Sequence, residues 1–116
     1  MTLLDPEIEA ALPLLNDQDP AVRRVGLLQI VDFADESPEL FVAATRDADA
    51  GVRLEAAKAL EGNPDAGAVR ALAVLLDDQD EEVVAAAAES LGEILDPAAG
   101  PVLIELLAQA SGEARA

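Results

Sequence analysis

Four carboxylates near the middle of the chain have the spacing of a calcium-binding loop. Counted from Asp78, acidic residues stand at positions 1, 3, 5 and 12, as Asp78, Asp80, Glu82 and Glu89. An EF-hand presents its carboxylate ligands at these positions, but it needs a glycine at position 6 for a sharp turn. This chain has Val83 there. The repeat described below also places Val83 in a helix, which carries Glu89 away from Asp80. We therefore expect no metal ion at this stretch.

The residue types needed for most other catalytic chemistry are absent from the sequence. The chain has no cysteine and no histidine. This excludes disulfides, thiolate nucleophiles and zinc–thiolate sites, and it removes the commonest general base and nearly all transition-metal sites. The carboxylates that remain all have an expected place at a helix cap, in a turn or on a solvent-facing surface. We expect a protein that is not an enzyme and that holds no cofactor.

The charge of the chain limits the class of partner. There are 24 acidic residues against 7 basic ones, which gives a net charge of −17. Binding to nucleic acid through its phosphates needs clustered Lys and Arg, and an anionic membrane surface would repel this chain. A protein partner, especially a basic one, remains, although the same acidity is also typical of a salt-adapted surface. No signal peptide and no membrane-spanning run is recognisable, which favours a cytoplasmic location.

The composition favours helices in a single domain. The 116 residues are enough for one domain, and 52% of them are apolar while only 2% are aromatic. The core must therefore consist of Ala, Leu, Val and Ile. Small and unbranched residues at this density favour helix, and no sustained alternation typical of strands is present.

A repeat of about thirty residues organises the chain. Three segments with an Asp-x-Asp motif align with one another, at residues 17–23, 47–53 and 78–84. Downstream of each motif, apolar and small residues recur with the spacing i, i+4, i+5, i+8, which marks one face of an α-helix. The three sets are Val22, Gly26, Leu27 and Ile30, then Val52, Ala56, Ala57 and Leu60, then Val83, Ala87, Ala88 and Leu91.

A second apolar segment precedes each of these motifs. These segments span residues 7–15, 39–45 and 68–76, and a fourth at 101–108 has no Asp-x-Asp after it. Each unit is therefore predicted to be two antiparallel helices joined by a short acidic turn. The predicted domain covers residues 1–110, with units at about 5–35, 36–62, 63–95 and 96–109, and residues 111–116 are predicted to be a disordered tail.

Capping residues mark the predicted helix starts. Five pairs place a capping side chain directly before a proline: Asp5-Pro6, Asp19-Pro20, Ser37-Pro38, Asn63-Pro64 and Asp96-Pro97. The side-chain oxygen can accept an unpaired N–H, and proline suits the first helical position. The second Asp of each motif, Asp19, Asp49 or Asp80, is predicted to be the N-cap of the helix that follows. Glu81 and Glu82 then stand in a first turn, where the helix dipole favours negative charge.

Arginine follows the motif in two of the three units. Arg23 and Arg53 are predicted to form a ladder between units, in which each guanidinium bridges acidic turns and the first Asp of a motif accepts turn N–H groups or an arginine. A direct role in binding a partner is the alternative. The third unit has Val84 at this position. We therefore expect the acidic turn at 77–82 to lack an internal counter-charge and to be available to a basic partner.

These motifs resemble the HEAT-like repeats, in particular the short form found in phycobilisome lyase subunits. Residues 96–107 (DPAAGPVLIELL) are similar to the first half of that family's pattern, and residues 75–83 (LLDDQDEEV) and 87–92 (AAESLG) to its second half. The resemblance covers about residues 6–108. It implies an all-α fold, a right-handed α-α superhelix (solenoid) of about three and a half helix pairs. It also implies a protein that binds partners with the second helix of each pair.

The outward face of the second helices carries the candidate contact residues. Opposite the predicted core stripe lie Val25, Leu28 and Asp32, then Glu55 and Lys58, then Ala86, Glu89 and Glu93. Together with the acidic residues Asp77, Asp78, Glu81 and Glu82, they are our candidate partner-binding set. Val25 and Leu28 are aliphatic on a surface where polar residues are expected, which suggests contact with another molecule. Scattered apolar residues without a role are the alternative.

Three alternative functions follow from these observations. The first is a non-enzymatic scaffold or interaction module that binds a protein through the second-helix face and the acidic turns. The second is an accessory subunit of an enzyme, as the resemblance to lyase subunits implies. The third is a homo-oligomer, because the helix predicted at 97–108 is apolar on several sides and lacks a mate.

Overall fold

The computed structural model describes residues 5–93, which form six α-helices and one short 3₁₀ helix with no strand among them. The helices are α1 (Pro6–Leu15), α2 (Pro20–Gln29), η1 (Val31–Phe33), α3 (Pro38–Ala44), α4 (Ala50–Ala59), α5 (Ala66–Leu75) and α6 (Glu81–Gly92). The predicted helix at 97–108, the unit that contains it and the predicted tail at 111–116 lie outside the described residues.

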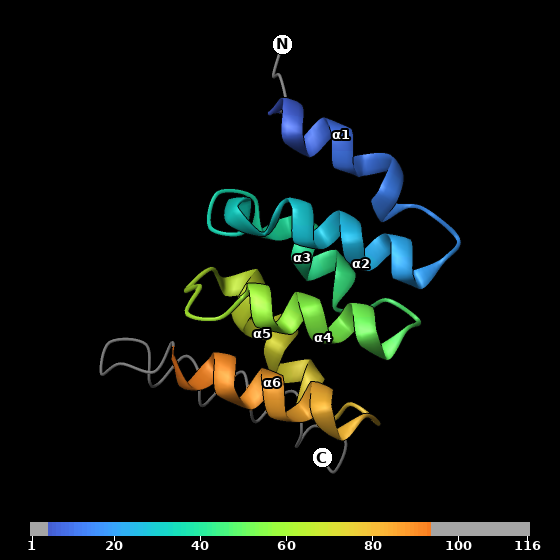
Figure 1. Cartoon of the computed structure of the whole chain (residues 1–116). Helices are drawn as coiled ribbons and strands as arrows, with labels where there is room; N and C mark the ends of the chain where they lie inside the picture. The colour runs from blue at the N-terminus through green and yellow to red at the C-terminus, as the bar shows by residue number, and fades with distance from the viewer. Residues whose placement is uncertain (1–4, 94–116) are drawn as a thin grey trace.

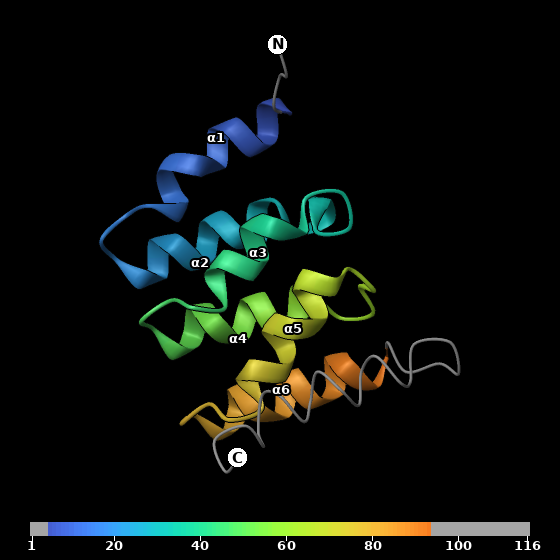
Figure 2. The same ribbon diagram turned by 180° about the vertical axis from the view of Figure 1, so that it is seen from behind.

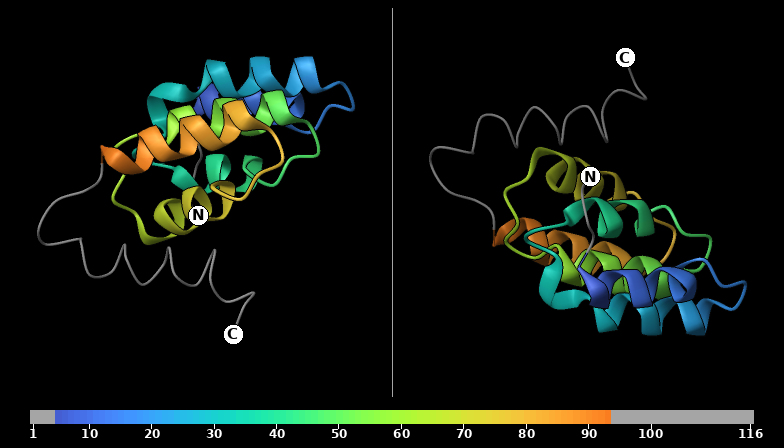
Figure 3. Two further views of the ribbon diagram at one scale, coloured as in Figure 1. Left: turned by 90° about the horizontal axis from the view of Figure 1, so that it is seen from below. Right: turned by 90° about the horizontal axis from the view of Figure 1, so that it is seen from above.

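Consecutive helices form three hairpin-like pairs that stack in two layers. The packed pairs are α1 with α2, α3 with α4, and α5 with α6 (Figure 1). The second helices α2, α4 and α6 pack side by side in one layer, and α3 packs against α5 in the other, as the reverse view also shows (Figure 2). Views along the stack show the two layers end-on (Figure 3). This arrangement is the all-α repeat solenoid that the sequence predicts.

The core is aliphatic, as the composition predicts, apart from Phe41, which the expectation of an Ala, Leu, Val and Ile core left out. The largest fully buried side chains are Phe41, Ile30, Leu60, Leu72, Val52 and Val83. The predicted stripe on the second helices faces this core at nearly every position, and in α4 all four of its residues are buried. Ala88 is the exception, because α6 turns it to solvent, and Val22 is only half-buried. Each helix pair has apolar surface that its own two helices do not cover. This surface becomes buried only when neighbouring pairs stack.

Helix starts agree with the capping prediction at the Asp-x-Asp motifs and differ at two of the proline pairs. The carboxylates of Asp19, Asp49 and Asp80 accept hydrogen bonds from backbone N–H groups of the following turns, and Asp5 does the same for α1. Ser37 stands before α3 but makes no side-chain capping bond. The helix predicted to begin at Pro64 begins instead at Ala66, with Asp65 as its cap. The pair Asp96-Pro97 lies outside the described residues.

Asn63 stabilises the connection between α4 and α5 instead of capping a helix. Its side chain is buried, its Nδ2 donates to the carbonyl of Ala34 at 3.2 Å, and its Oδ1 accepts from the N–H of Asp65 at 2.9 Å. The preceding Gly62 has a φ of 72°, a left-handed conformation that favours glycine and ends the turn after α4. The bond from Asn63 to Ala34 thereby joins the connection between α4 and α5 to the connection between η1 and α3.

A glycine brings α1 close to α2. A Cβ atom on residue 26 would lie 2.9 Å from the Cβ of Leu14 and 3.0 Å from a methyl carbon of Leu15. The corresponding residues of the other second helices are Ala56 and Ala87. α1 makes little contact with α3, whereas α3 packs firmly on α5. The first helix is therefore held mainly by α2, and this leaves a hollow between α1 and α3.

Candidate protein-interaction surface

Two arginine–aspartate pairs, here called the ladder, connect the acidic turns of successive units. Arg23 donates from Nε and one terminal nitrogen to the two carboxylate oxygens of Asp47, at 2.8 and 2.9 Å. Arg53 makes the same bidentate pair with Asp78, at 2.8 and 3.2 Å. A bidentate guanidinium–carboxylate pair fixes both distance and orientation. The ladder therefore sets the position of each unit relative to the next.

Each guanidinium also holds the turn of its own unit. The remaining terminal nitrogen of Arg23 donates to the carbonyls of Asp17 and Gln18, and that of Arg53 donates to the carbonyls of Asp47 and Ala48. The first Asp of each motif in addition accepts the N–H two residues later, at 2.8 to 2.9 Å. The expected bridging of acidic turns by Arg23 and Arg53 is thus present, and it runs from each unit to the one that follows.

The ladder contacts shift the pKa values of Arg23, Asp47 and Asp78. Hydrogen bonds to Asp47 raise the pKa of the Arg23 guanidinium above its ordinary value, against the opposing effect of burial. For both ladder aspartates, partial burial by itself raises the pKa of the carboxyl. The hydrogen bonds from the arginine and from the turn N–H outweigh it, so that the pKa of Asp47 and of Asp78 is lowered. Both carboxylates are therefore held in the charged form.

The third acidic turn, residues 77–82, has an internal counter-charge, contrary to the expectation from the sequence. Arg53 of the preceding unit pairs with Asp78, whose side chain is only 8% exposed, so Asp78 is not available to a partner. The expectation was wrong because each arginine reaches the next unit's aspartate as well as its own turn. Val84 leaves the third unit without an arginine that could extend the ladder, and no Asp-x-Asp follows it in the sequence to receive one. Asp77, Glu81 and Glu82 are exposed.

The four carboxylates with calcium-loop spacing are held in different ways. Asp78 is paired with Arg53, while Asp80 accepts the N–H groups of Glu82 and Val83 as a helix cap. Glu82 and Glu89 lie on α6 and are exposed. Within residues 5–93, no group of three or more acidic residues is arranged to hold a metal ion.

The outward residues of α2, η1, α4 and α6 form one surface, here called the second-helix face. It contains the predicted residues Val25, Leu28, Asp32, Glu55, Lys58, Ala86, Glu89 and Glu93, together with Val31, which the sequence reasoning did not single out. Val25 is 48% exposed, Leu28 53% and Val31 40%. Val31 follows Leu28 by three residues and could have been found by extending the helical spacing one step beyond the predicted helix.

Two shallow hollows bring several of these residues together. One lies between α2 and α4, where Leu28 and Val31 face Glu55, Lys58 and Ala59 across a volume of about 90 Å³. The other lies between α4 and α6 and is lined by Lys58, Glu61, Ala86, Glu89 and Ser90. Lys58 borders both hollows. Val25, Asp32 and Glu93 line neither of them.

Glu55 has an internal partner that the sequence reasoning missed. Arg24 donates to a carboxylate oxygen of Glu55 at 3.2 Å, which joins α2 to α4 beside the first hollow. The Arg24 side chain is largely exposed, so this ion pair is weaker in water than the bidentate ladder pairs. It leaves Lys58 as the basic group of the second-helix face that has no ion pair within the described residues.

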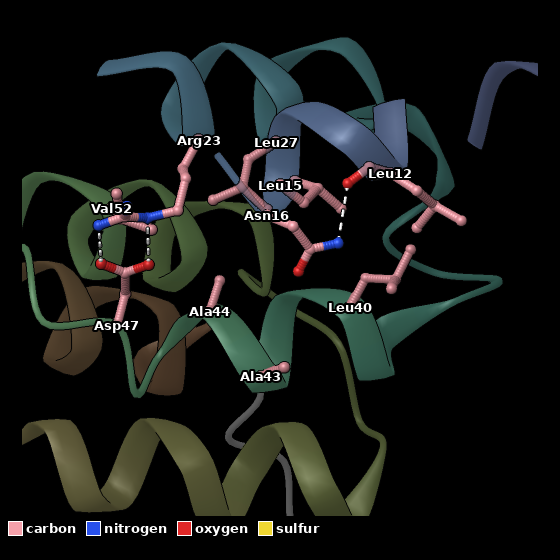
Figure 4. A pocket seen from close by; sticks show the side chains of 10 residues that line it. All are labelled: Leu12, Leu15, Asn16, Arg23, Leu27, Leu40, Ala43, Ala44, Asp47 and Val52. Atoms are coloured by element: carbon pink, nitrogen blue, oxygen red, sulfur yellow. Dashed lines mark hydrogen bonds and ion pairs between the residues drawn. The ribbon is translucent and has the colours of Figure 1, made fainter. Parts of the chain in front are cut away.

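A third hollow lies between α1 and α3, has the same volume as the hollow between α4 and α6, and offers no reactive group. Its volume is about 280 Å³. Figure 4 shows the aliphatic side chains that line it, with the Arg23–Asp47 pair at one end. The amide of Asn16, in the same wall, donates to the carbonyl of Leu12 at 3.0 Å. The hollow therefore contains an ion pair already formed and an amide, but no candidate nucleophile or general base.

Comparison with protein families agrees with this architecture. The model of the HEAT repeats matches residues 37–116, more than half of the chain. The chain belongs to the HEAT-repeat family. The pair α1–α2 precedes the matched region and has the same capped acidic turn and the same ladder arginine as the matched pair α3–α4. HEAT repeats generally mediate protein–protein interactions or scaffolding.

Two further findings are negative. A search of curated proteins gives no significant match. Between residues 5 and 93, no helix has both the length and the apolar character that a bilayer span requires.

Proposed function

We propose that this HEAT-repeat protein is a non-enzymatic docking module that binds a protein partner through the second-helix face. The observation that carries the proposal is the group of three exposed aliphatic residues Val25, Leu28 and Val31. Leu28 and Val31 line the hollow between α2 and α4, and Val25 lies three residues before Leu28 on α2. Single exposed aliphatic residues are ordinary on a protein surface. Three that follow one another along α2 and η1, beside a hollow, form the kind of apolar centre that interfaces use.

The charges around this centre favour a partner with basic residues at its rim. Asp32 lies next to Val31, and Glu89 and Glu93 extend the acidic surface along α6. The exposed acids of the third turn, Asp77, Glu81 and Glu82, continue it to the edge of the molecule. Two bases stand among these acids: Arg24, which is paired with Glu55, and Lys58, which has no ion pair within the described residues. A partner would place an aliphatic side chain over Leu28 and Val31 and its Lys or Arg toward α6, where the charges are complementary.

Affinity capture with a charge-insertion variant tests this proposal. Leu28→Glu places a carboxylate at the centre of the apolar group, where burial without a partner is costly, and should abolish capture of the specific partner from source cells. Val74→Glu is the matched control, because Val74 is equally exposed, at 58%, and lies on α5 in the other layer. Equal capture by wild type and Leu28→Glu would refute the proposed surface.

Dissociation constants of the captured partner for acidic-surface variants test the charge argument separately. Glu89→Gln and Glu93→Gln should each weaken binding by a few-fold, and more at low salt than at high salt, because rim charges act mainly through screened, long-range attraction. Ser90 is buried and bonded, so it should not be altered in this series. Tighter binding after either substitution would mean that the partner's rim is acidic.

A further inference from the structure

A fourth hollow, between α3 and α5, is distinguished by its charge. It has a volume of about 160 Å³ and is lined by Val42, Thr45, Arg46, Gly67, Arg70, Ala71 and Val74. Its lining residues come from α3, α5 and the residues next to them. Both helices belong to the layer of first helices, whereas the second-helix face belongs to α2, α4 and α6 (Figure 3). The sequence analysis assigned no binding role to any of these residues.

Arg46 and Arg70 bring positive charge into this hollow although the chain carries a net charge of −17. Arg23, Arg24 and Arg53 each form an ion pair with a carboxylate. Arg46 and Arg70 form none with any residue that the structure describes, and both are exposed. Two guanidinium groups that border the same hollow, in a chain so rich in acids, concentrate positive charge at this place.

The repeat itself does not require either arginine. The position of Arg46, directly before the acidic turn, is held by Asn16 in the first unit and by Asp77 in the third. The position of Arg70 in α5 is held by Glu9 in α1 and by Glu39 in α3. Structural arginines in this fold occupy the ladder position instead. The two basic side chains therefore depart from the repeat, and they do so at two positions that the fold brings together.

Aliphatic surface accompanies the two charges. Val74 is 58% exposed, the highest value among the large apolar residues that the structure describes. Val42 and Ala71 lie beside it, half-buried. The hydroxyl of Thr45 donates to the carbonyl of Val42 at 2.6 Å, so the wall has no unpaired hydroxyl proton to offer. The hollow thus has room for one branched aliphatic group next to two guanidinium groups.

We propose that this hollow binds an acidic peptide segment of a protein, with one aliphatic side chain on Val42 and Val74 and adjacent carboxylates on Arg46 and Arg70. A guanidinium group has a planar set of donors that matches a carboxylate in a bidentate pair. A nucleic acid is disfavoured because two cations are too few to offset the repulsion of its phosphates by this chain. The site is independent of the second-helix face and would hold a second, acidic partner.

The probe for this site is the acetylated, amidated tripeptide Glu-Leu-Glu, compared with Gln-Leu-Gln. Methyl-labelled protein is titrated with each peptide in about 0.15 M salt, which screens most of the long-range repulsion between the acidic chain and an acidic ligand. We expect saturable shifts of the methyl signals of Val42, Thr45 and Val74 with Glu-Leu-Glu. We expect the affinity for Gln-Leu-Gln to be lower by about tenfold, because it cannot form charge-assisted bonds.

Three variants separate a specific site from a general charge effect. Arg70→Gln and Arg46→Gln should each weaken binding of Glu-Leu-Glu by about fivefold or more. Lys58→Gln removes the same charge from the second-helix face and should leave the affinity unchanged. The proposal is overturned if no saturable shift appears, if both peptides bind equally, or if Lys58→Gln weakens binding as much as Arg70→Gln. None of these outcomes bears on binding at Leu28, so the docking proposal is tested separately.

Discussion

The junction between the first and second units differs from the junction between the second and third. At the second junction both layers pack, α3 on α5 and α4 on α6, and the hydroxyl of Ser90 donates to the carbonyl of Ala57 at 2.7 Å in a buried bond. At the first junction α2 packs on α4, but α1 barely meets α3, and a hollow of about 280 Å³ lies between these first helices. The hollow of equal volume at the second junction lies instead between the second helices α4 and α6. The residue that corresponds to Ser90 there is Ala59, which has no hydroxyl.

The exposed aliphatic residues of the second-helix face are found at the first junction, where the first helices α1 and α3 barely meet. Val25, Leu28 and Val31 belong to the first unit, and the corresponding outward positions of α6 are Ala86 and Glu89. We infer that the second junction gives the solenoid its rigidity, whereas the first supplies the apolar surface for docking. Four predictions test or sharpen this difference.

The largest expected effect comes from a matched pair of leucine truncations. Leu72, on α5, is fully buried, and Leu27, on α2, is nearly so but borders the hollows on both sides of α2. Leu72→Ala should lower the free energy of unfolding by about 4 kcal/mol and Leu27→Ala by only about 2 kcal/mol, because a site beside existing space relaxes more easily. Urea unfolding followed by circular dichroism measures both. Equal losses would mean that the two junctions are equally well packed.

The ladder gives the next largest effect. Arg53→Met keeps the aliphatic stem but leaves the nearly buried carboxylate of Asp78 without its bidentate partner, which should cost about 2 kcal/mol of unfolding free energy. Arg23→Met should cost less, because the side chain of Asp47 is more exposed than that of Asp78. Arg46→Met is the control and should be close to neutral. A loss for Arg53→Met no larger than that of the control would remove the ladder as a source of stability.

The lowered pKa of Asp78 gives a pH-dependent prediction of smaller size. A carboxyl whose folded pKa lies below its unfolded value contributes its full stability above the unfolded pKa, and this contribution is lost as the pH falls through the folded pKa. The difference in unfolding free energy between wild type and Asp78→Asn should therefore stay constant from pH 7 to about pH 5 and shrink below about pH 4. A difference that does not change down to pH 2.5 would contradict the lowered pKa.

Filling the hollow of the first junction should give the smallest effect. Ala43 lies on α3 in the wall of that hollow, and Ala43→Leu should raise the unfolding free energy by about 0.5–1 kcal/mol and slow amide hydrogen exchange in α1. Ala85→Leu, at an exposed position of α6, is the control and should change neither quantity. Destabilisation by Ala43→Leu would show that α1 and α3 already fit each other closely in solution.

The sequence predicted those features that depend on local chemistry or on repetition. The caps at Asp19, Asp49 and Asp80 need only a carboxylate and a backbone N–H group two or three residues later. The apolar stripes of the second helices need only their helical spacing. Asp65 was missed as a cap because Asn63-Pro64 offers the same chemistry two residues earlier. The asparagine is instead drawn to the carbonyl of Ala34, which is distant in sequence.

The features that depend on the relation between units could not be predicted from one unit. The repeat indicates that Arg53 bridges turns, but not that it reaches Asp78 and thereby neutralises the third turn. The pair of Arg24 with Glu55, and the approach of Arg46 to Arg70 across one hollow, likewise depend on how successive helices stack. The hollow between α1 and α3 follows from the close approach of α1 to α2 at Gly26, which no motif signals.

The dissociation constant of a captured partner, measured with three proteins, tests the docking account most directly. Isothermal titration with wild type, Leu28→Glu and Val74→Glu compares an exposed aliphatic residue of the second-helix face with one in the other layer. We predict that Leu28→Glu weakens binding by about 100-fold, the effect of burying one unpaired charge at an interface, while Val74→Glu stays within about twofold of wild type. An undiminished affinity of Leu28→Glu, or an equal loss in Val74→Glu, would contradict the assignment of docking to the second-helix face.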